Sequence, residues 1–203
     1  MYDQMFNDID THILVVWQSV GVLVGAFAIF ALAEKQVISF DVATTLIVLL
    51  TSWLLAHLQD ASYWYNRNLV IIANIERQFL VVSDLRDIHY YFGKHRPKNR
   101  MISHLKIQYA LGIALAAIMV LLHFVTRVVP GFSEPWSHLD VQRALPYTVV
   151  AAALIYLKTF ARRERTRYEE FLTNSPGATV NSAGIVYGMG HGFRPGDEVN
   201  DAK

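Results

Sequence analysis

Residues 13–33 read ILVVWQSVGVLVGAFAIFALA, a run that contains no ionisable side chain. A helix needs about 20 predominantly apolar residues to cross the hydrocarbon core of a bilayer, which is about 30 Å thick. This run meets that requirement on its own. It therefore predicts a membrane-spanning helix near the start of the chain.

Three further apolar stretches follow, at residues 42–58, 109–125 and 145–157. The first two extend into further apolar or aromatic sequence and reach spanning length. The last is short, and it reaches about 18 residues only if Arg143 and Lys158 extend their charged ends from the lipid into the headgroup layer. The chain as a whole therefore predicts four spans.

Lys and Arg residues fall on alternate sides of these four stretches. None precedes the first stretch, one separates the first from the second, and eight lie between the second and third; two lie between the third and fourth, and seven follow the fourth. Short cytoplasmic segments retain Lys and Arg. We therefore expect an all-α integral membrane protein of the plasma membrane (the inner membrane in a bacterium). Its four transmembrane helices would form two antiparallel hairpins with both termini in the cytoplasm.

Composition excludes several other classes. The net charge of +1 gives no overall basic field, so no nucleic-acid partner is expected. The absence of cysteine excludes disulfides, thiolate metal sites and lipidated cysteine. Residues 31–33 (ALA) resemble a signal-peptide cleavage site, but the preceding segment is acidic and has no basic residue, so no cleavage is expected.

The second apolar stretch has no evident stop, because neither Gly nor Pro occurs between residues 42 and 87. We expect one helix that leaves the lipid and continues into the cytoplasm as a stalk. Apolar residues recur there at alternating spacings of three and four, which is typical of a coiled coil or helical bundle. The predicted seam is Tyr65, Asn68, Ile72, Ile75, Phe79 and Val82. Its partner is either the helix that follows the fourth span or another subunit.

These patterns divide the chain into six segments. They are a cytoplasmic N-terminal segment that is frayed or forms an interfacial turn (1–12), the first transmembrane hairpin (13–58), the cytoplasmic stalk with a basic-aromatic loop (59–104), the second hairpin (105–160), a cytoplasmic helix (161–172) and a disordered Gly-rich tail (173–203).

Small residues on two spans let neighbouring helices approach closely. The predicted packing residues are Gly21, Gly25, Ala28, Ala110, Gly112, Ala114 and Ala116. Their spacing fits packing within one subunit and packing between subunits equally well. We expect a homo-oligomer, in which these residues pack either within one subunit or between subunits.

The loop at residues 89–106 reads HYYFGKHRPKNRMISHLK and mixes aromatic with basic residues. Such mixtures collect where a helix meets lipid headgroups. We expect contacts between anionic headgroups and Lys94, Arg96, Lys98 and Arg100.

Residues that could carry chemistry are sparse. No Asp, Glu, Lys or Arg lies in the middle of a predicted span, which argues against a pump or an ion-coupled carrier. No catalytic residue, metal site or cofactor is expected. The weak haem or metal candidates are His12, His57 and His104, which lack a ligand spacing. The polar residues Gln18, Thr45 and Ser52 either bond within the helices or line a pore.

The sequence favours a non-enzymatic, homo-oligomeric signalling protein or membrane-permeabilising effector, controlled through the cytoplasmic stalk and able to receive a cytoplasmic protein partner. One alternative is a passive channel or small-solute carrier. A second alternative is an accessory subunit that binds haem or quinone.

Overall fold

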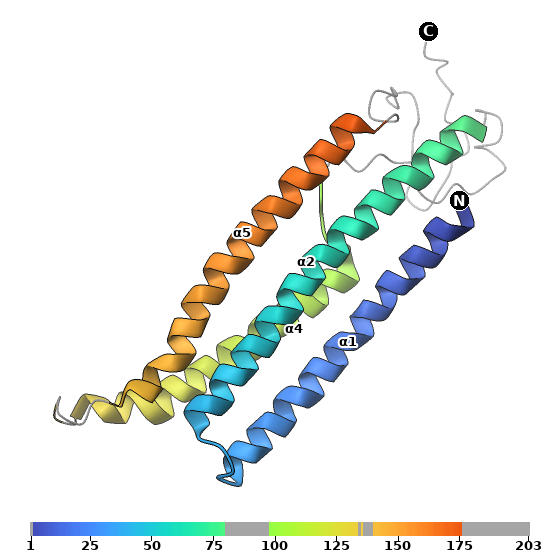
Figure 1. The fold of residues 1–203 in the computed structure, drawn as a ribbon. Coiled ribbons are helices and arrows are strands. Elements are labelled where there is room, and N and C mark those ends of the chain that lie inside the picture. The colour runs from blue at the N-terminus through green and yellow to red at the C-terminus, as the bar shows by residue number, and fades with distance from the viewer. Residues whose placement is uncertain (1, 80–97, 134, 136–139, 176–203) are drawn as a thin grey trace, which may run out of the picture. The chain divides into compact units, whose positions relative to one another are not determined.

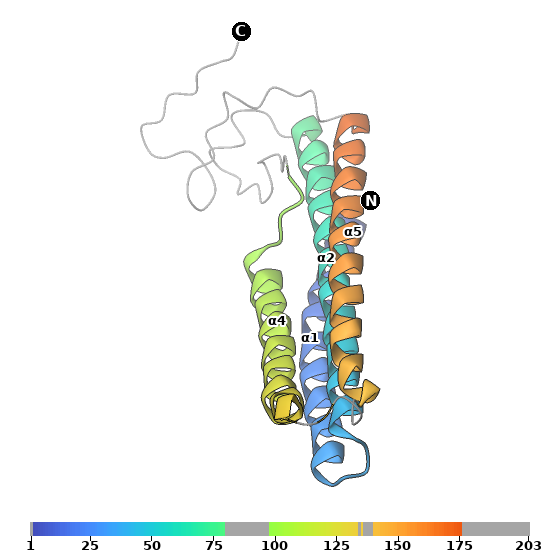
Figure 2. The same ribbon diagram turned by 90° about the vertical axis from the view of Figure 1, so that its left-hand side faces the viewer.

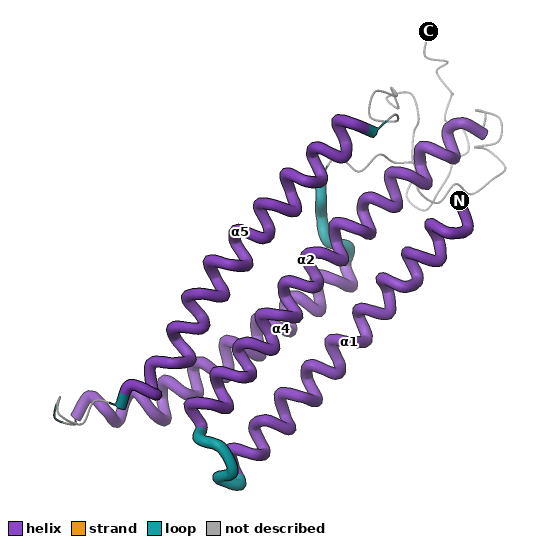
Figure 3. The backbone as a smooth tube through the Cα atoms, viewed as in Figure 1, coloured by secondary structure: helices purple, strands orange, loops and turns teal. Residues whose placement is uncertain are grey.

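The computed structural model describes residues 2–79, 98–133, 135 and 140–175. Within these residues the chain is helical apart from short connections, and it contains no strand (Figures 1 and 3). Four helices are long and apolar enough to cross a membrane. The prediction of an all-α chain with four helices of spanning length is thus confirmed for the described part.

The described part contains four long helices. They are α1 (Tyr2–Glu34), α2 (Phe40–Phe79), α4 (Ser103–His123) and α5 (Leu145–Asn174). A π-helical turn (Phe124–Val128) and a 3₁₀ turn (Val129–Ser133) follow α4, and a 3₁₀ turn (Val141–Ala144) precedes α5.

The expectation of a turn or a frayed segment at residues 1–12 is wrong, because α1 begins at Tyr2. The physical reason is that no Gly or Pro precedes Gly21, so nothing interrupts the helix. The unbroken second helix is confirmed as far as Phe79. Its expected continuation to Asp87 lies outside the described residues.

The connection between α1 and α2 is a compact helix stop. The N–H of Val37 donates to the carbonyl of Leu32 and the N–H of Gln36 to that of Ala33, the pair of bonds of a Schellman motif. Gln36 takes the left-handed position of this motif with φ of 57°. The motif satisfies the last carbonyls of α1 and reverses the chain.

The chain forms two compact units. The span unit comprises Ile13–Ser62 and Met101–Glu164, and the stalk unit comprises Met1–His12, Tyr63–Arg100 and Arg165–Lys203. The proposed division into six segments is not tested by this result and stays a prediction.

The core of the span unit forms between α1, α2 and α4 (Figure 2). One buried cluster joins Val22, Leu54 and Leu105, and a second joins Ala26, Ile47 and Met119. Residue numbers rise along α1 and α4 as they fall along α2, so both helices pack antiparallel to α2. Half of the residues in the apolar segment of α2 are buried inside the protein, against 6% in the apolar segment of α5. The helix α2 is therefore the central one.

The stalk unit has its own core. Tyr63, Val70 and Tyr168 form a buried cluster between the second half of α2 and the end of α5. Leu69 and Ile72 form another, against which Met5 of α1 packs. Two arginines lie over the aromatic rings of this unit: Arg167 is 4.1 Å from the centroid of Tyr63, and Arg67 is 5.2 Å from that of Trp64.

Candidate functional site

A buried carboxylate stands at the start of α2. Ser39 precedes the helix, and its Oγ accepts a hydrogen bond from the N–H of Val42. This bond caps the helix and places Asp41 in its first turn, where the helix dipole favours a negative charge. The side chain of Asp41 is only 1% exposed, so its charge requires partners within the protein.

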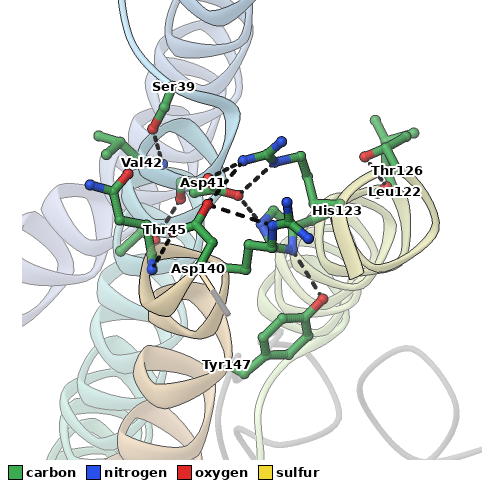
Figure 4. A network of polar contacts seen from close by, with 12 residues as sticks. Ser39, Asp41, Val42, Thr45, Leu122, His123, Thr126, Asp140 and Tyr147 are labelled. Carbon is green, nitrogen blue, oxygen red and sulfur yellow. Dashed lines mark hydrogen bonds and ion pairs between the residues drawn. The ribbon is translucent and has the colours of Figure 1, made fainter. Parts of the chain in front are cut away.

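The partners of Asp41 come from the end of α4 and from the π-helical turn that follows it (Figure 4). Arg127 donates from Nε to Oδ1 at 3.1 Å and from Nη2 to Oδ2 at 2.9 Å, a bidentate pair. His123 places Nε2 2.8 Å from Oδ1 of the same carboxylate. Three polar contacts thus join Asp41 of α2 to the end of α4 and to the π-helical turn.

His123 extends the network to α5. Its Nδ1 lies 3.0 Å from the hydroxyl of Tyr147. Because a carboxylate only accepts, Nε2 carries the proton shared with Asp41 and Nδ1 faces the tyrosine. The imidazole also stacks on Phe40, with ring centroids 5.8 Å apart. Contacts on both ring nitrogens and on one face hold this side chain in one orientation.

A second carboxylate lies at the edge of the network. Oδ2 of Asp140 is 3.5 Å from Nη2 of Arg127 and 3.5 Å from Nε of Arg143. About a third of each of these three side chains is exposed, so these pairs are weaker than those of Asp41. Oδ1 of Asp140 accepts from the N–H of Gln142 and caps the 3₁₀ turn before α5.

The order Asp41–His123–Tyr147 resembles a catalytic relay only in composition. His123 has no exposed surface, and the hollow beside Arg127, lined by residues of the α1–α2 connection, is not lined by His123 or Tyr147. A general base must reach the proton that it removes. The arrangement is therefore best explained as a network of ion pairs and hydrogen bonds that holds the ends of three helices together.

Sequence reasoning missed this network, although two signals were present. His123 and Arg127 are four residues apart at the end of the third apolar stretch, and Asp41 directly precedes the second. Helical residues four apart share a face. The N-terminus of one helix and the C-terminus of its antiparallel neighbour lie together, so the opposite charges there could have been paired on that basis. The sequence does not show which helices are neighbours.

The predicted packing residues divide between the core and the surface. A Cβ on Gly25 would lie 3.3 Å from Leu50, and a Cβ on Gly112 would lie 3.1 Å from Leu55. Both glycines therefore let α2 approach. Gly21 has nothing within 4 Å of such a Cβ. Exposed positions are taken by Gly21, Ala28, Ala110 and Ala114, and Ala116 is half-buried.

Gly112→Leu is expected to lower the free energy of unfolding by about 1–3 kcal/mol, because the new side chain overlaps Leu55 and Leu54. Gly21→Leu is the matched control, since it makes the same change on an open helix surface. Thermal unfolding of the two variants in detergent micelles measures the difference. Equal midpoints would contradict the packing described for Gly112.

The three polar residues considered as pore lining differ in exposure. Gln18 is exposed, whereas Thr45 and Ser52 are half-buried. The hydroxyl of Thr45 donates to the carbonyl of Asp41 and that of Ser52 to the carbonyl of Val48. These hydroxyls are thus satisfied within their own helix.

The predicted seam is partly buried. Asn68 and Ile72 are buried, and Tyr65 and Ile75 are half-buried. Oδ1 of Asn68 has no hydrogen-bond partner among the described residues. Val82, and the side chain of Phe79, lie outside the described part.

Two of the three histidine candidates have side chains that the structure describes. His57 stacks on Trp53 with ring centroids 5.3 Å apart, and His104 is exposed. The side chain of His12 lies outside the described part. Among the side chains that the structure describes, no three His, Asp or Glu residues form a group that could hold a metal ion.

Of the predicted headgroup contacts, Lys98 and Arg100 are described and exposed, and Lys94 and Arg96 lie outside the described residues.

Comparison of the whole chain with protein-family models, with curated proteins and with solved structures gave no match.

Proposed function

We propose that this chain is a non-enzymatic, multi-pass protein of the plasma membrane. It acts as a homo-oligomeric signalling protein or membrane-permeabilising effector, and it is controlled through its cytoplasmic stalk unit. Both termini lie in the cytoplasm.

The surface of the span unit supports a lipid environment. Large apolar side chains on all four long helices are at least half exposed, which is unusual for a protein in water. They include Trp17, Val24, Phe27, Trp53, Ile107, Ile118, Leu121, Leu154 and Ile155.

The distribution of Lys and Arg supports the proposed orientation. Fifteen of the 18 Lys and Arg residues lie between the second and third apolar stretches or after the fourth. Short cytoplasmic segments retain Lys and Arg, which favours the cytoplasm for this side.

The observation that carries the proposal is the continuity of three helices. Each of α1, α2 and α5 contributes residues to both units without a break. A change in the packing of the stalk unit therefore acts on the helices that form the span unit. The sparse burial of α5 leaves apolar surface for lipid or for another subunit.

A cross-link within the stalk unit tests control of the membrane. Nδ2 of Asn74 donates to Oγ of Ser175 at 2.9 Å, so these side chains join α2 to the end of α5. The native chain has no cysteine, which leaves Asn74→Cys/Ser175→Cys as the only reactive pair. We expect vesicles that carry this variant to release trapped dye, release to fall when a reducible bis-maleimide closes the pair, and release to return on reduction.

Two controls accompany this measurement. Thr166→Cys/Glu170→Cys places both thiols one turn apart on the exposed surface of α5, so its cross-link joins no second helix and should leave release unchanged. Vesicles without protein give the background. Release that stays at the background in every state would overturn the proposed permeabilising activity.

A further inference from the structure

A cavity of about 180 Å³ in the stalk unit is lined by three cations and one carboxylate. The lining residues are Lys98, Asn99, Arg100, Arg165, Tyr168 and Glu169. We propose that this cavity binds a phosphate group. Three cations from two chain segments around one hollow match the charge of a phosphate, whose oxygens accept several hydrogen bonds at once.

Hydrogen bonds from α2 hold the segment that carries Lys98 and Arg100. Asn66 is fully buried on α2, and its Nδ2 donates to Oδ1 of Asn99 at 2.8 Å and to the carbonyl of Arg100 at 2.9 Å. These bonds fix the backbone that bears Lys98 and Arg100. A site held in this way loses little conformational freedom when a ligand binds.

The third cation, Arg165, can exchange its carboxylate partner for a phosphate. Arg165 donates from Nε to Oε1 of Glu169 at 2.9 Å, but its side chain is 75% exposed. Exposed ion pairs contribute little because water screens them. A phosphate can therefore replace the carboxylate as the acceptor of the guanidinium, and Glu169 opposes this exchange by its negative charge.

Tyr168 gives the cavity a rigid wall. It has no exposed surface, and its ring meets that of Tyr63 edge to face, with centroids 6.3 Å apart. This contact fixes the turn of α5 that carries Arg165 against α2. The cations on the two segments are thus held around one volume.

The volume limits the ligand. Sites for drug-sized molecules usually occupy about 300–1,000 Å³. The smaller cavity suits a phosphate group and little more of the molecule that bears it. Two sources share this chemistry: the headgroup of an anionic phospholipid and a phosphate free in the cytoplasm.

The test measures binding to the full chain, so it does not depend on the proposed effector activity. In the first arm, inorganic phosphate is titrated calorimetrically into the protein in dodecylmaltoside, a detergent without phosphate. In the second arm, the protein is mixed with phosphatidylglycerol or phosphatidylcholine, and the lipid phosphorus retained after gel filtration is measured. Binding in the first arm identifies a free phosphate, and selective retention of phosphatidylglycerol identifies a headgroup.

Variants locate the site. Arg165→Gln and Arg100→Gln should each weaken binding about tenfold, because each removes a charged hydrogen-bond donor. Glu169→Gln should strengthen it. Arg162→Gln is the matched control, because it removes the same charge from an exposed position of α5 that does not line the cavity.

Circular dichroism confirms that each variant remains folded. Absence of saturable binding in both arms would overturn the proposal. So would an equal loss in Arg162→Gln and Arg165→Gln, which would show attraction to the general positive charge instead of a site.

Discussion

Asp41→Ala is expected to lower the free energy of unfolding by about 3 kcal/mol or more, since removing one member of a buried ion pair typically costs about 3–5 kcal/mol. The change leaves the guanidinium of Arg127 and Nε2 of His123 without their shared acceptor. His123 is fully buried and cannot turn to water. Arg127 is 36% exposed and is partly hydrated, which places the expected cost toward the lower end of that range.

Thermal unfolding in dodecylmaltoside measures this effect. Asp140→Ala is the matched control, because it removes a carboxylate from the same network at 35% exposure and at contacts of 3.5 Å. Its cost should be less than about 1 kcal/mol. If the two variants unfolded at the same temperature, Asp41 would not be the centre of the network.

The double variant Asp41→Ala/Arg127→Met separates the pair from its surroundings. Replacement of both charged partners removes the unpaired guanidinium, so the double variant should be more stable than Asp41→Ala alone. A sum of independent losses would show that the two side chains are not coupled.

Tyr168→Ala should have an effect of similar size on the stalk unit. Truncating a buried aromatic side chain usually costs about 3–5 kcal/mol, because the remaining cavity cannot fully collapse. Tyr168 has no exposed surface and packs against Tyr63 and Val70 of α2. Its loss therefore removes a buried contact that the end of α5 makes with α2 in this unit.

Hydrogen exchange resolves this effect by segment. Amides of residues 165–175 should exchange faster in Tyr168→Ala than in the native chain, because local opening there becomes less costly. Tyr156→Ala, an aromatic truncation on the same helix at a side chain that is 55% exposed, should leave that exchange unchanged. Equal protection in both variants would mean that Tyr168 does not hold the end of α5.

Part of the proposed phosphate site could be predicted from the sequence and part could not. Lys98 and Arg100 stand out because their loop is rich in basic and aromatic residues. Arg165 belongs to the same cavity but lies in a different helix, so no local pattern joins it to them. The glycines show the same division: the spacing of Gly21 and Gly25 marks a close-packing face, but only the neighbouring helix decides that Gly25 meets Leu50 and that Gly21 meets nothing.

The sequence by itself determined the four long apolar helices and the uninterrupted course of α2. These depend on local properties, namely the length of apolar runs and the absence of Gly and Pro. Only the tertiary structure decided that Asp41 meets His123 and Arg127, more than 80 residues away, and that Asn66 holds the backbone at Arg100. Such contacts arise when helices choose their neighbours, and that choice depends on the packing of whole surfaces instead of on the order of residues along one helix.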